Sequence, residues 1–275
     1  MAGFYYVIIY YLISIKMSNK SISKIIIAGP CAAESRKQIE LTAEKISALN
    51  NIIMRASIFK PRTQPGFEGL GAEGVELLIK AAEKNIAVAT EVMVPEHVNI
   101  ILEKIANLHK KPEFILWIGS RNQCHINQRE IARIIHEKAP KSMRLMIKNQ
   151  PWKDETHWIG IIEHVLSSGL SPERIILCHR GFYPDSNQNP NMFRNLPDYA
   201  MAMRIKEKTK LPMIIDPSHI GGSIENVFRV MEESLQFDFD GMMVEVHPNP
   251  KEAMTDAKQQ LNFNEFERLL AIIKN

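Results

Sequence analysis

Cationic side chains recur in this chain just after short runs of β-branched and other apolar residues. Guanidinium and ammonium groups bind phosphate and carboxylate, and arginine does so with two parallel hydrogen bonds. Cations gathered at one place repel each other unless bound anions neutralise them. The alternative is that each pairs with a neighbouring carboxylate, but these positions in the sequence hold few acids. The cations concerned are Arg55, Lys60, Arg62, Arg121, Lys148 and Arg180.

A second set of side chains offers sulfur, nitrogen and oxygen ligands. Mixed ligands of these kinds suit a divalent transition metal that keeps an open position for a substrate. Their spacing forms no strong metal motif, so a buried structural cysteine and a hydrogen-bonded histidine remain the alternative. The four candidates are Cys31, His219, Glu245 and Asp256.

Two more histidines, His179 and His247, also follow apolar runs. We expect both to lie near the same cations. Each is interpreted either as an acid–base or supporting group or as a structural histidine whose ring nitrogens are satisfied.

Eight strand-like runs must position these residues. Several, such as KIIIAGP and PMIID, are almost continuously apolar, as expected of parallel strands buried on both faces. The runs are Lys24–Cys31, Ile52–Ile58, Ala87–Val92, Phe114–Gly119, Arg144–Asn149, Arg174–Gly181, Met213–His219 and Gly241–Pro248.

Amphipathic, helix-like stretches separate the runs. Ser35 and Gln38 have the spacing of a capping box, and the last helix is predicted to start near Asn262 with Glu265 three residues on. The longest irregular stretch, Phe182–Asn195, follows the sixth run, and long loops at such positions are often functional.

Eight β-then-α units predict an α/β fold, namely a single-domain (β/α)8 TIM barrel, with an open doubly wound sheet as the alternative. A closed barrel gathers the carboxyl ends of all strands at one face, where barrel enzymes place their chemistry. It also makes the first and last strands neighbours. Cys31 and Glu245 should therefore lie close together, beside the cations.

Composition narrows the class of protein. Charged residues make up 24% of the chain, the net charge is only +3, and no long basic run is present, so nucleic-acid binding has little support. Three cysteines without a CxxC pair indicate a reducing compartment, and we expect a cytoplasmic protein.

Residues 1–23 are interpreted as an N-terminal extension that precedes a barrel domain of residues 24–275. Phe4–Ile15 is strongly apolar, but it is shorter than the roughly 20 residues that span a bilayer. Met17 opens a more polar start, so residues 1–16 are predicted to be untranslated, disordered or an added contact. We expect no membrane insertion.

Seven motifs occur along the chain in order. They are GPCAAES, KPRTQPGFEGLG, TEV, WIGSRN, ILCHRG, DPSHIGG and MVEVHPNPKEAMTDAKQQL. Together, from about residue 24 to 261, they resemble the DAHP (3-deoxy-D-arabino-heptulosonate 7-phosphate) synthases of the short type I-beta kind. The variants IKNQPW, CHRGF and FRNLP are most similar to the branch often fused to a chorismate mutase domain.

The resemblance implies a reaction: phosphoenolpyruvate condenses with erythrose 4-phosphate, phosphate is released, and the shikimate pathway to aromatic amino acids begins. It also implies one divalent metal ion (Mn, Fe, Co, Zn or similar) on Cys31, His219, Glu245 and Asp256. The implied phosphoenolpyruvate ligands are Arg55, Lys60, Arg121, Lys148 and Arg180.

In the same family, the segment that matches Arg62 and Thr63 contacts erythrose 4-phosphate. Lys60 is assigned to proton movement or to stabilising the new oxygen, and Glu91 to orienting the water; both are hypotheses. The family is usually oligomeric, so a homo-oligomer is expected. This sequence shows no regulatory domain or mutase domain, so feedback control would need a separate partner such as a chorismate mutase.

Three alternatives remain. The sister enzyme that makes 3-deoxy-octulosonate 8-phosphate from arabinose 5-phosphate shares the chemistry, but it typically carries a KANRS-like segment in place of KPRT. A Schiff-base aldolase would use Lys148 as nucleophile. A non-catalytic barrel could instead serve a chorismate mutase as partner.

Overall fold

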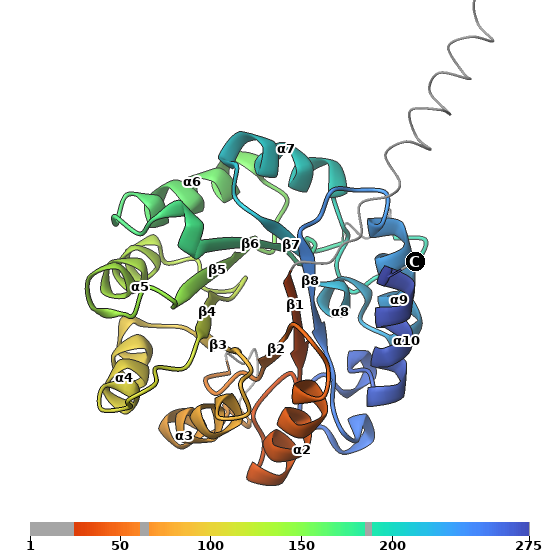
Figure 1. Cartoon of the computed structure of the whole chain (residues 1–275). Coiled ribbons are helices and arrows are strands. Elements are labelled where there is room, and N and C mark those ends of the chain that lie inside the picture. Colours follow the sequence, from red (N-terminus) through yellow and green to blue (C-terminus); the bar gives the residue numbers. More distant parts are fainter. Residues whose placement is uncertain (1–24, 61–65, 185–188, 275) are drawn as a thin grey trace, which may run out of the picture.

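The computed structural model describes residues 25–60, 66–184 and 189–274. Eight parallel strands form a closed barrel in chain order, and helices surround it (Figure 1). The strands are β1 (Ile25–Gly29), β2 (Ile52–Arg55), β3 (Val88–Val92), β4 (Phe114–Ile118), β5 (Arg144–Lys148), β6 (Ile175–His179), β7 (Met213–Ile215) and β8 (Gly241–Glu245).

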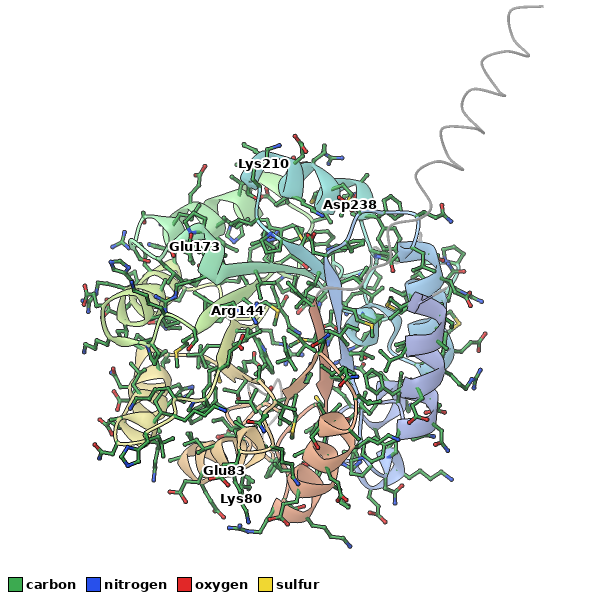
Figure 2. All side chains as sticks on the ribbon, in the orientation of Figure 1. Lys80, Glu83, Arg144, Glu173, Lys210 and Asp238 are labelled. Carbon is green, nitrogen blue, oxygen red and sulfur yellow. The ribbon has the colours of Figure 1, made fainter. Side chains whose placement is uncertain are left out.

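Helices return the chain from one strand to the next and cover the outside of the barrel. Charged side chains such as Lys80, Glu83 and Lys210 lie on the outer edge of this ring (Figure 2). The helices are α2 (Arg36–Ser47), α3 (Gly71–Ala82), α4 (Pro95–Ile105), α5 (His125–Lys138), α6 (Glu155–Leu166), α7 (Tyr199–Thr209), α8 (Pro217–Gly221), α9 (Ile224–Ser234) and α10 (Phe263–Lys274), with short 3₁₀ turns at Pro172–Arg174, Pro250–Glu252 and Ala257–Gln259.

Two apolar cores explain why the strand runs are continuously hydrophobic. The larger core lies between the strands and the helices, and the smaller one fills the inside of the barrel with residues such as Ile27, Ile115 and Met243. Alternate residues of each strand point into these two cores, so neither face can be polar.

Closure of the barrel decides which strand ends meet. β1 pairs with β8 along its length, with Gly29 opposite Glu245. The prediction of a closed (β/α)8 barrel is confirmed, and an open doubly wound sheet is excluded because that fold leaves its edge strands unpaired.

Helix starts follow the predicted capping signals. Ser35 Oγ accepts a hydrogen bond from Gln38 N, although the Gln38 side chain reaches back to Glu34 N instead of Ser35 N. Asn262 and Glu265 make the reciprocal pair of a capping box, each side chain accepting from the other's backbone N–H.

One boundary differs from the prediction. β7 ends at Ile215, and the next residues turn into the short helix α8, so His219 lies on a helix and not at the end of a strand. Asp216 caps this helix because its side chain accepts from His219 N at 3.0 Å. Residues 1–23 lie outside the described part of the chain, within which no helix is long and apolar enough to cross a membrane.

Candidate active site

A cavity of about 330 Å³ opens at the carboxyl ends of the strands. Residues from seven of the eight strands or from the segments that follow them contribute to its wall, which is the usual location of chemistry in a barrel enzyme. The lining residues are Arg55, Lys60, Glu91, Trp117, Gly119, Ser120, Arg121, Lys148, Arg180, Arg194, His219, Met254, Thr255 and Asp256.

Five of the six cations singled out in the sequence line this one cavity, as expected: Arg55, Lys60, Arg121, Lys148 and Arg180. The sixth, Arg62, lies with Thr63 outside the described residues, so both assignments remain predictions. Cations from four different strands and their loops therefore face a common space.

The expectation that few acids accompany these cations is wrong for three of them. Arg55 lies 3.3 Å from Glu245 Oε1, and Lys148 Nζ lies 2.6 Å from Asp216 Oδ2. Lys60 Nζ lies 3.9 Å from an Asp256 oxygen. These carboxylates sit at the strand ends and in the loop after β8, and buried cations need such partners.

Arg180 has a weaker partner. Its guanidinium donates to the neutral amide oxygen of Asn195 at 2.8 Å, and its side chain is almost completely buried. Burial lowers the pKa of Arg180 to about 10, so it is charged at neutral pH. A buried arginine held mainly by a neutral amide is suited to bind an anionic ligand.

Arg194 is a further cation that the sequence reasoning missed. It belongs to the loop after β6, which was predicted to be functional, and its guanidinium lies 3.0 Å from Asp256 and 2.6 Å from Gln259. With Arg194, the described lining holds six cations against the two carboxylates of Glu91 and Asp256. The carboxylates of Asp216 and Glu245 do not remove the positive excess, so the cavity suits anions.

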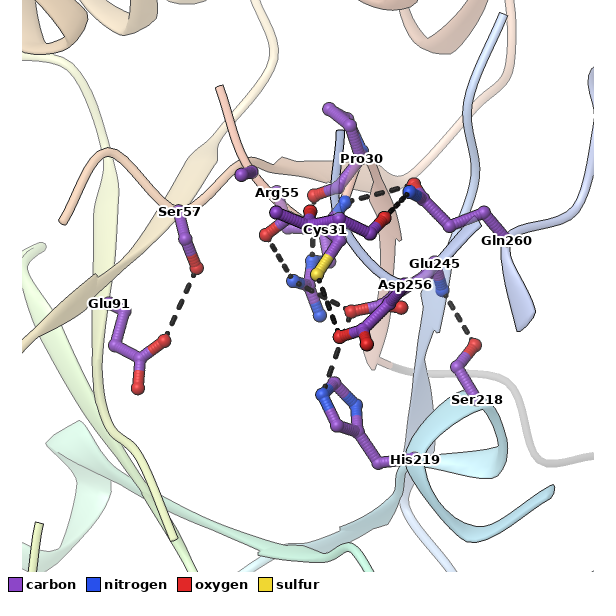
Figure 3. A network of polar contacts seen from close by, with 12 residues as sticks. Pro30, Cys31, Arg55, Ser57, Glu91, Ser218, His219, Glu245, Asp256 and Gln260 are labelled. Atoms are coloured by element: carbon purple, nitrogen blue, oxygen red, sulfur yellow. Dashed lines mark hydrogen bonds and ion pairs between the residues drawn. The ribbon is translucent and has the colours of Figure 1, made fainter. Parts of the chain in front are cut away.

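Three of the four predicted metal ligands form one cluster. One ligand atom each of Cys31, Glu245 and Asp256 lies within 4.8 Å of the other two (Figure 3). The fourth, His219, faces the same cluster because its Nε2 lies 3.6 Å from Glu245 Oε1. Thus the segment after β1, the end of β8, the loop after β8 and α8 bring together residues that are up to 225 positions apart in sequence.

The donor set fits a divalent metal. Glu245 is fully buried, and its Oε1 accepts no hydrogen bond although it faces Cys31 and His219. Its other oxygen, Oε2, accepts from Gln259 at 2.7 Å. Oε1 forms an ion pair with Arg55 at 3.3 Å but accepts no hydrogen bond, and it lies beside a thiol, an imidazole and a second carboxylate. Such a buried oxygen keeps a lone pair that could bind a metal ion.

Two glutamines in the loop after β8 hold this cluster, and the sequence analysis did not assign them a role. Gln260 accepts from Cys31 N at 3.0 Å and donates to Thr255 O at 2.8 Å, which ties the end of β1 to this loop.

Asp256 adopts a left-handed backbone conformation, with a φ of 48°. Aspartate tolerates this conformation better than most residues, and here it orients the carboxylate inward.

The ionisable groups of this cluster shift one another's pKa values. Burial, together with the carboxylates of Glu245 and Asp256, raises the pKa of the Cys31 thiol. Burial opposes the charge on Lys60, but Cys31, whose sulfur lies 2.7 Å from Nζ, and the surrounding carboxylates outweigh it and raise the pKa of Lys60. Lys60 is therefore a firmly charged ammonium group between the metal candidates and the cavity.

Glu91 also lies in the cavity wall, on β3. Its Oε2 accepts a hydrogen bond from Ser57 Oγ at 3.3 Å, and Figure 3 shows it opposite the metal candidates. A Cβ atom at Gly119 would come within 1.9 Å of Glu91 Oε1. Glycine at the end of β4 is thus needed for Glu91 to occupy this position.

Neither His179 nor His247 lines the cavity, which corrects the expectation that both lie with the cations. His179 points outward among Trp158, Phe182 and Tyr199, and its Nε2 accepts from Asp198 N at 2.9 Å. This position favours the structural interpretation of His179, although only Nε2 of its ring is hydrogen-bonded and the buried Nδ1 has no hydrogen-bond partner. His247 Nδ1 accepts from Asn249 N within the loop after β8.

Acid should destabilise the fold through His179. Burial lowers its pKa to about 3, whereas an unfolded histidine titrates near 6.5. The unfolded state therefore binds the extra proton first, and stability is lost as the pH falls from about 6.5 toward 3, by roughly 1 kcal/mol per pH unit. Denaturant unfolding at pH 7 and 5 should show a smaller loss in His179→Gln, which keeps an acceptor for Asp198 N. An equal loss in both proteins would contradict this role.

Fold and site together define a (β/α)8 barrel enzyme whose cationic cavity adjoins a candidate metal centre. The sequence profile of the DAHP synthetase I family matches residues 17–275. The chain belongs to this family, which confirms the resemblance carried by its motifs.

Individual relatives agree with this assignment. The chain is 32% identical to a phospho-2-dehydro-3-deoxyheptonate aldolase of Thermotoga maritima, over 90% of this chain and 68% of that protein. The crystal structure of the Thermotoga maritima DAHP synthase superposes with a TM-score of 0.78 at 29% identity, covering 91% of this chain and 68% of the other. A 2-dehydro-3-deoxyphosphooctonate aldolase of Geobacter sulfurreducens is 25% identical over 91% of each chain.

Proposed function

We propose that this protein is a 3-deoxy-7-phosphoheptulonate synthase, a transferase that condenses phosphoenolpyruvate with erythrose 4-phosphate and releases phosphate. The observation that carries the proposal is the joint position of the cationic cavity and the Cys31–Glu245–Asp256 cluster at one barrel face. The chain's place in the DAHP synthetase I family supports the same reaction.

Phosphoenolpyruvate carries a phosphate and a carboxylate, and the cavity offers a cation for each. Arg121, Lys148 and Arg180 line the cavity, and Arg55, which is completely buried, lies against the ring of Trp117 at 5.0 Å. Bidentate binding by arginine would fix the enol phosphate so that its carbon three faces the cluster. We assign Arg62 and Thr63 to contacts with erythrose 4-phosphate, as the family resemblance implies.

A divalent ion (Mn, Fe, Co, Zn or similar) held by Cys31, His219, Glu245 and Asp256 would supply Lewis-acid polarisation of the aldehyde. Carbon three of phosphoenolpyruvate then attacks the aldehyde carbon, and water adds at carbon two. The resulting phosphohemiketal expels phosphate, so the atoms of the two substrates and one water account for both products.

Lys60 and Glu91 are the catalytic residues of this proposal. Lys60 Nζ lies beside Cys31 Sγ, where it can stabilise negative charge on the new oxygen or deliver a proton to it. Glu91 lies across the cavity from the cluster and accepts a hydrogen bond from Ser57, which leaves a carboxylate to orient the water.

Replacing Gly119 by alanine should displace Glu91, because the new Cβ would overlap its carboxylate. We expect turnover to fall about tenfold to a hundredfold with little change in thermal stability, since a misplacement of about 1 Å can cost that much. Gly160→Ala is the matched control because nothing lies within 4 Å of the position its Cβ would take. Equal turnover in Gly119→Ala and wild type would contradict the role of Glu91.

A second candidate is the synthesis of 3-deoxy-octulosonate 8-phosphate, favoured by the similarity to the Geobacter sulfurreducens enzyme over 91% of both chains. The KPRT segment that separates the two enzymes spans Lys60–Thr63, of which only Lys60 is described. A Schiff-base aldolase is less compatible with the site, because Lys148 is ion-paired with buried Asp216 and serves better as a cation than as a nucleophile.

The test is an assay of phosphoenolpyruvate loss by its ultraviolet absorbance, with the metal-reconstituted protein and either erythrose 4-phosphate or arabinose 5-phosphate, with and without EDTA. Loss with erythrose 4-phosphate alone that EDTA abolishes is the expected result. Loss with arabinose 5-phosphate would assign the sister reaction instead. No loss with either aldose, under several divalent metals, would contradict both proposed reactions and favour a non-catalytic barrel.

We also propose a cytoplasmic homo-oligomer whose barrel domain comprises residues 24–275, with residues 1–23 as an extension. Regulation would come from a separate partner such as a chorismate mutase. Size-exclusion chromatography with light scattering, with and without that partner, tests both the oligomer and the association.

A further inference from the structure

Asp216 lies beneath the cavity and contacts both Lys148, one of the cations, and His219, one of the predicted metal ligands. Its side chain is completely buried. Oδ2 lies 2.6 Å from Lys148 Nζ, and Oδ1 accepts from His219 N. Oδ2 is also the carboxylate oxygen 2.9 Å from His219 Nδ1, which is within hydrogen-bond distance although the ring is not aligned for a full hydrogen bond. Neither the motifs nor the proposed reaction gives this carboxylate a role.

These contacts belong to a closed circuit at the floor of the cavity. Lys148 and Arg55 both lie against the ring of Trp117, at 5.6 and 5.0 Å. Arg55 pairs with Glu245, and Glu245 faces His219 Nε2 at 3.6 Å. The circuit thus joins the anion-binding residues to the metal candidates, in the order Asp216, Lys148, Trp117, Arg55, Glu245 and His219.

We propose that Asp216 is a positioning residue that fixes His219 in the tautomer with its proton on Nδ1, directs the free Nε2 electron pair to the Cys31–Glu245–Asp256 cluster, and holds Lys148 in the cavity. The inference rests on the proposed metal site. Ligating histidines commonly donate their second ring N–H to a carboxylate, which sets the tautomer and strengthens the ligand.

Hydrogen-bond chemistry makes this tautomer depend on a carboxylate. Lys148 can only donate, and ionised Asp216 can only accept, so a proton on His219 Nδ1 meets an acceptor. In Asp216→Asn, the amide oxygen is needed to cap α8 at His219 N, and the amide N–H group then faces both Lys148 and the ring. Nδ1 would have to accept, the proton would move to Nε2, and Nε2 could no longer bind a metal.

The first test measures binding of Mn²⁺ to the chelator-treated full chain by electron paramagnetic resonance of the free ion. We expect Asp216→Asn to weaken binding by about 10- to 100-fold, the usual effect of removing a carboxylate behind a ligating histidine. Asp154→Asn is the matched control. Asp154 also caps a helix, α6, by accepting from the N–H of a histidine three residues on, His157, but it lies outside the cavity.

The second test reads the tautomer without metal or activity. Long-range ¹H–¹⁵N spectra of the protein labelled at histidine, with His219 assigned by the signal lost in His219→Gln, report which ring nitrogen carries the proton. We expect Nδ1–H in the wild type and in Asp154→Asn, and Nε2–H in Asp216→Asn. A merely structural role of Asp216 would not move the proton between the two nitrogens.

The possible outcomes distinguish a failure of this inference from a failure of the proposed metal-dependent function. A wild-type His219 with its proton on Nε2 overturns the inference even if Asp216→Asn does not fold. Tight wild-type binding of Mn²⁺ that Asp216→Asn leaves unchanged also overturns it, while the metal site stands. A wild type that binds no Mn²⁺ shows that the metal site itself is wrong.

Discussion

Cys31→Ala is expected to lose both divalent metal and turnover. The thiol donates to Asp256 at 3.3 Å and is the only sulfur in the cluster, so its removal takes away a ligand that no described neighbour replaces. Lewis-acid polarisation is worth several kcal/mol, and each 1.4 kcal/mol is about tenfold in rate, so we expect turnover to fall by about a hundredfold or more. Mn²⁺ titration and the phosphoenolpyruvate assay measure the two effects.

Cys124→Ala is the control for this variant, because Cys124 is an exposed thiol at the start of α5, outside the cavity. It should bind metal and turn over as the wild type does. Thermal unfolding in EDTA checks that the small cavity left at buried Cys31 has not unfolded the barrel. Full turnover by a folded Cys31→Ala protein would remove Cys31 from the metal site.

Lys60→Met should have the second largest effect, mainly on kcat. Methionine keeps the length of the side chain but removes the ammonium group that lies 2.7 Å from Cys31 Sγ. If Lys60 moves a proton or stabilises the new oxygen, turnover should fall by about 10²- to 10⁴-fold. If it only binds phosphoenolpyruvate, KM should rise while kcat holds.

Lys80→Met provides the comparison for this variant. Lys80 is also ion-paired, with Glu40 at 3.3 Å, but on the outer surface of the helices, where such pairs contribute little. Its kcat and KM should be unchanged. An unchanged kcat in Lys60→Met would show that Lys60 has no catalytic role.

Much of the fold could be predicted because the signals are local. A strand buried on both faces must be apolar throughout, so eight such runs mark eight strands, and capping residues such as Asn262 and Glu265 mark a helix start. The end of β7 was placed wrongly because Asp216 and Pro217 favour a helix start inside a run that also looks like a strand.

The contacts within the site were harder to predict, because the residues that make them are distant in sequence. Residue type and position after a strand pointed to Cys31 and Lys148, but no pattern links Lys148 to Asp216, which are 68 residues apart. In the same way, no pattern links Arg194 to the cavity, because the only sequence signal for its loop was the loop's length. His179 and His247 were wrongly expected in the cavity. At the end of a strand, packing decides whether a side chain points into the barrel or toward the surrounding helices, and residue type does not reveal this.

The sequence by itself determined the number and order of the β-then-α units, the kinds of chemical groups at the strand ends and, through its motifs, the family. These follow from periodicity and residue type, which are properties of short segments. Barrel closure, predicted from the sequence, already placed Glu245 beside the end of β1. Only the tertiary structure decided the other pairs, such as Lys148 with Asp216 and Arg194 with Asp256. Such contacts depend on strand register and side-chain packing, because Coulomb and ligand interactions act over a few ångströms in space, whatever the separation along the chain.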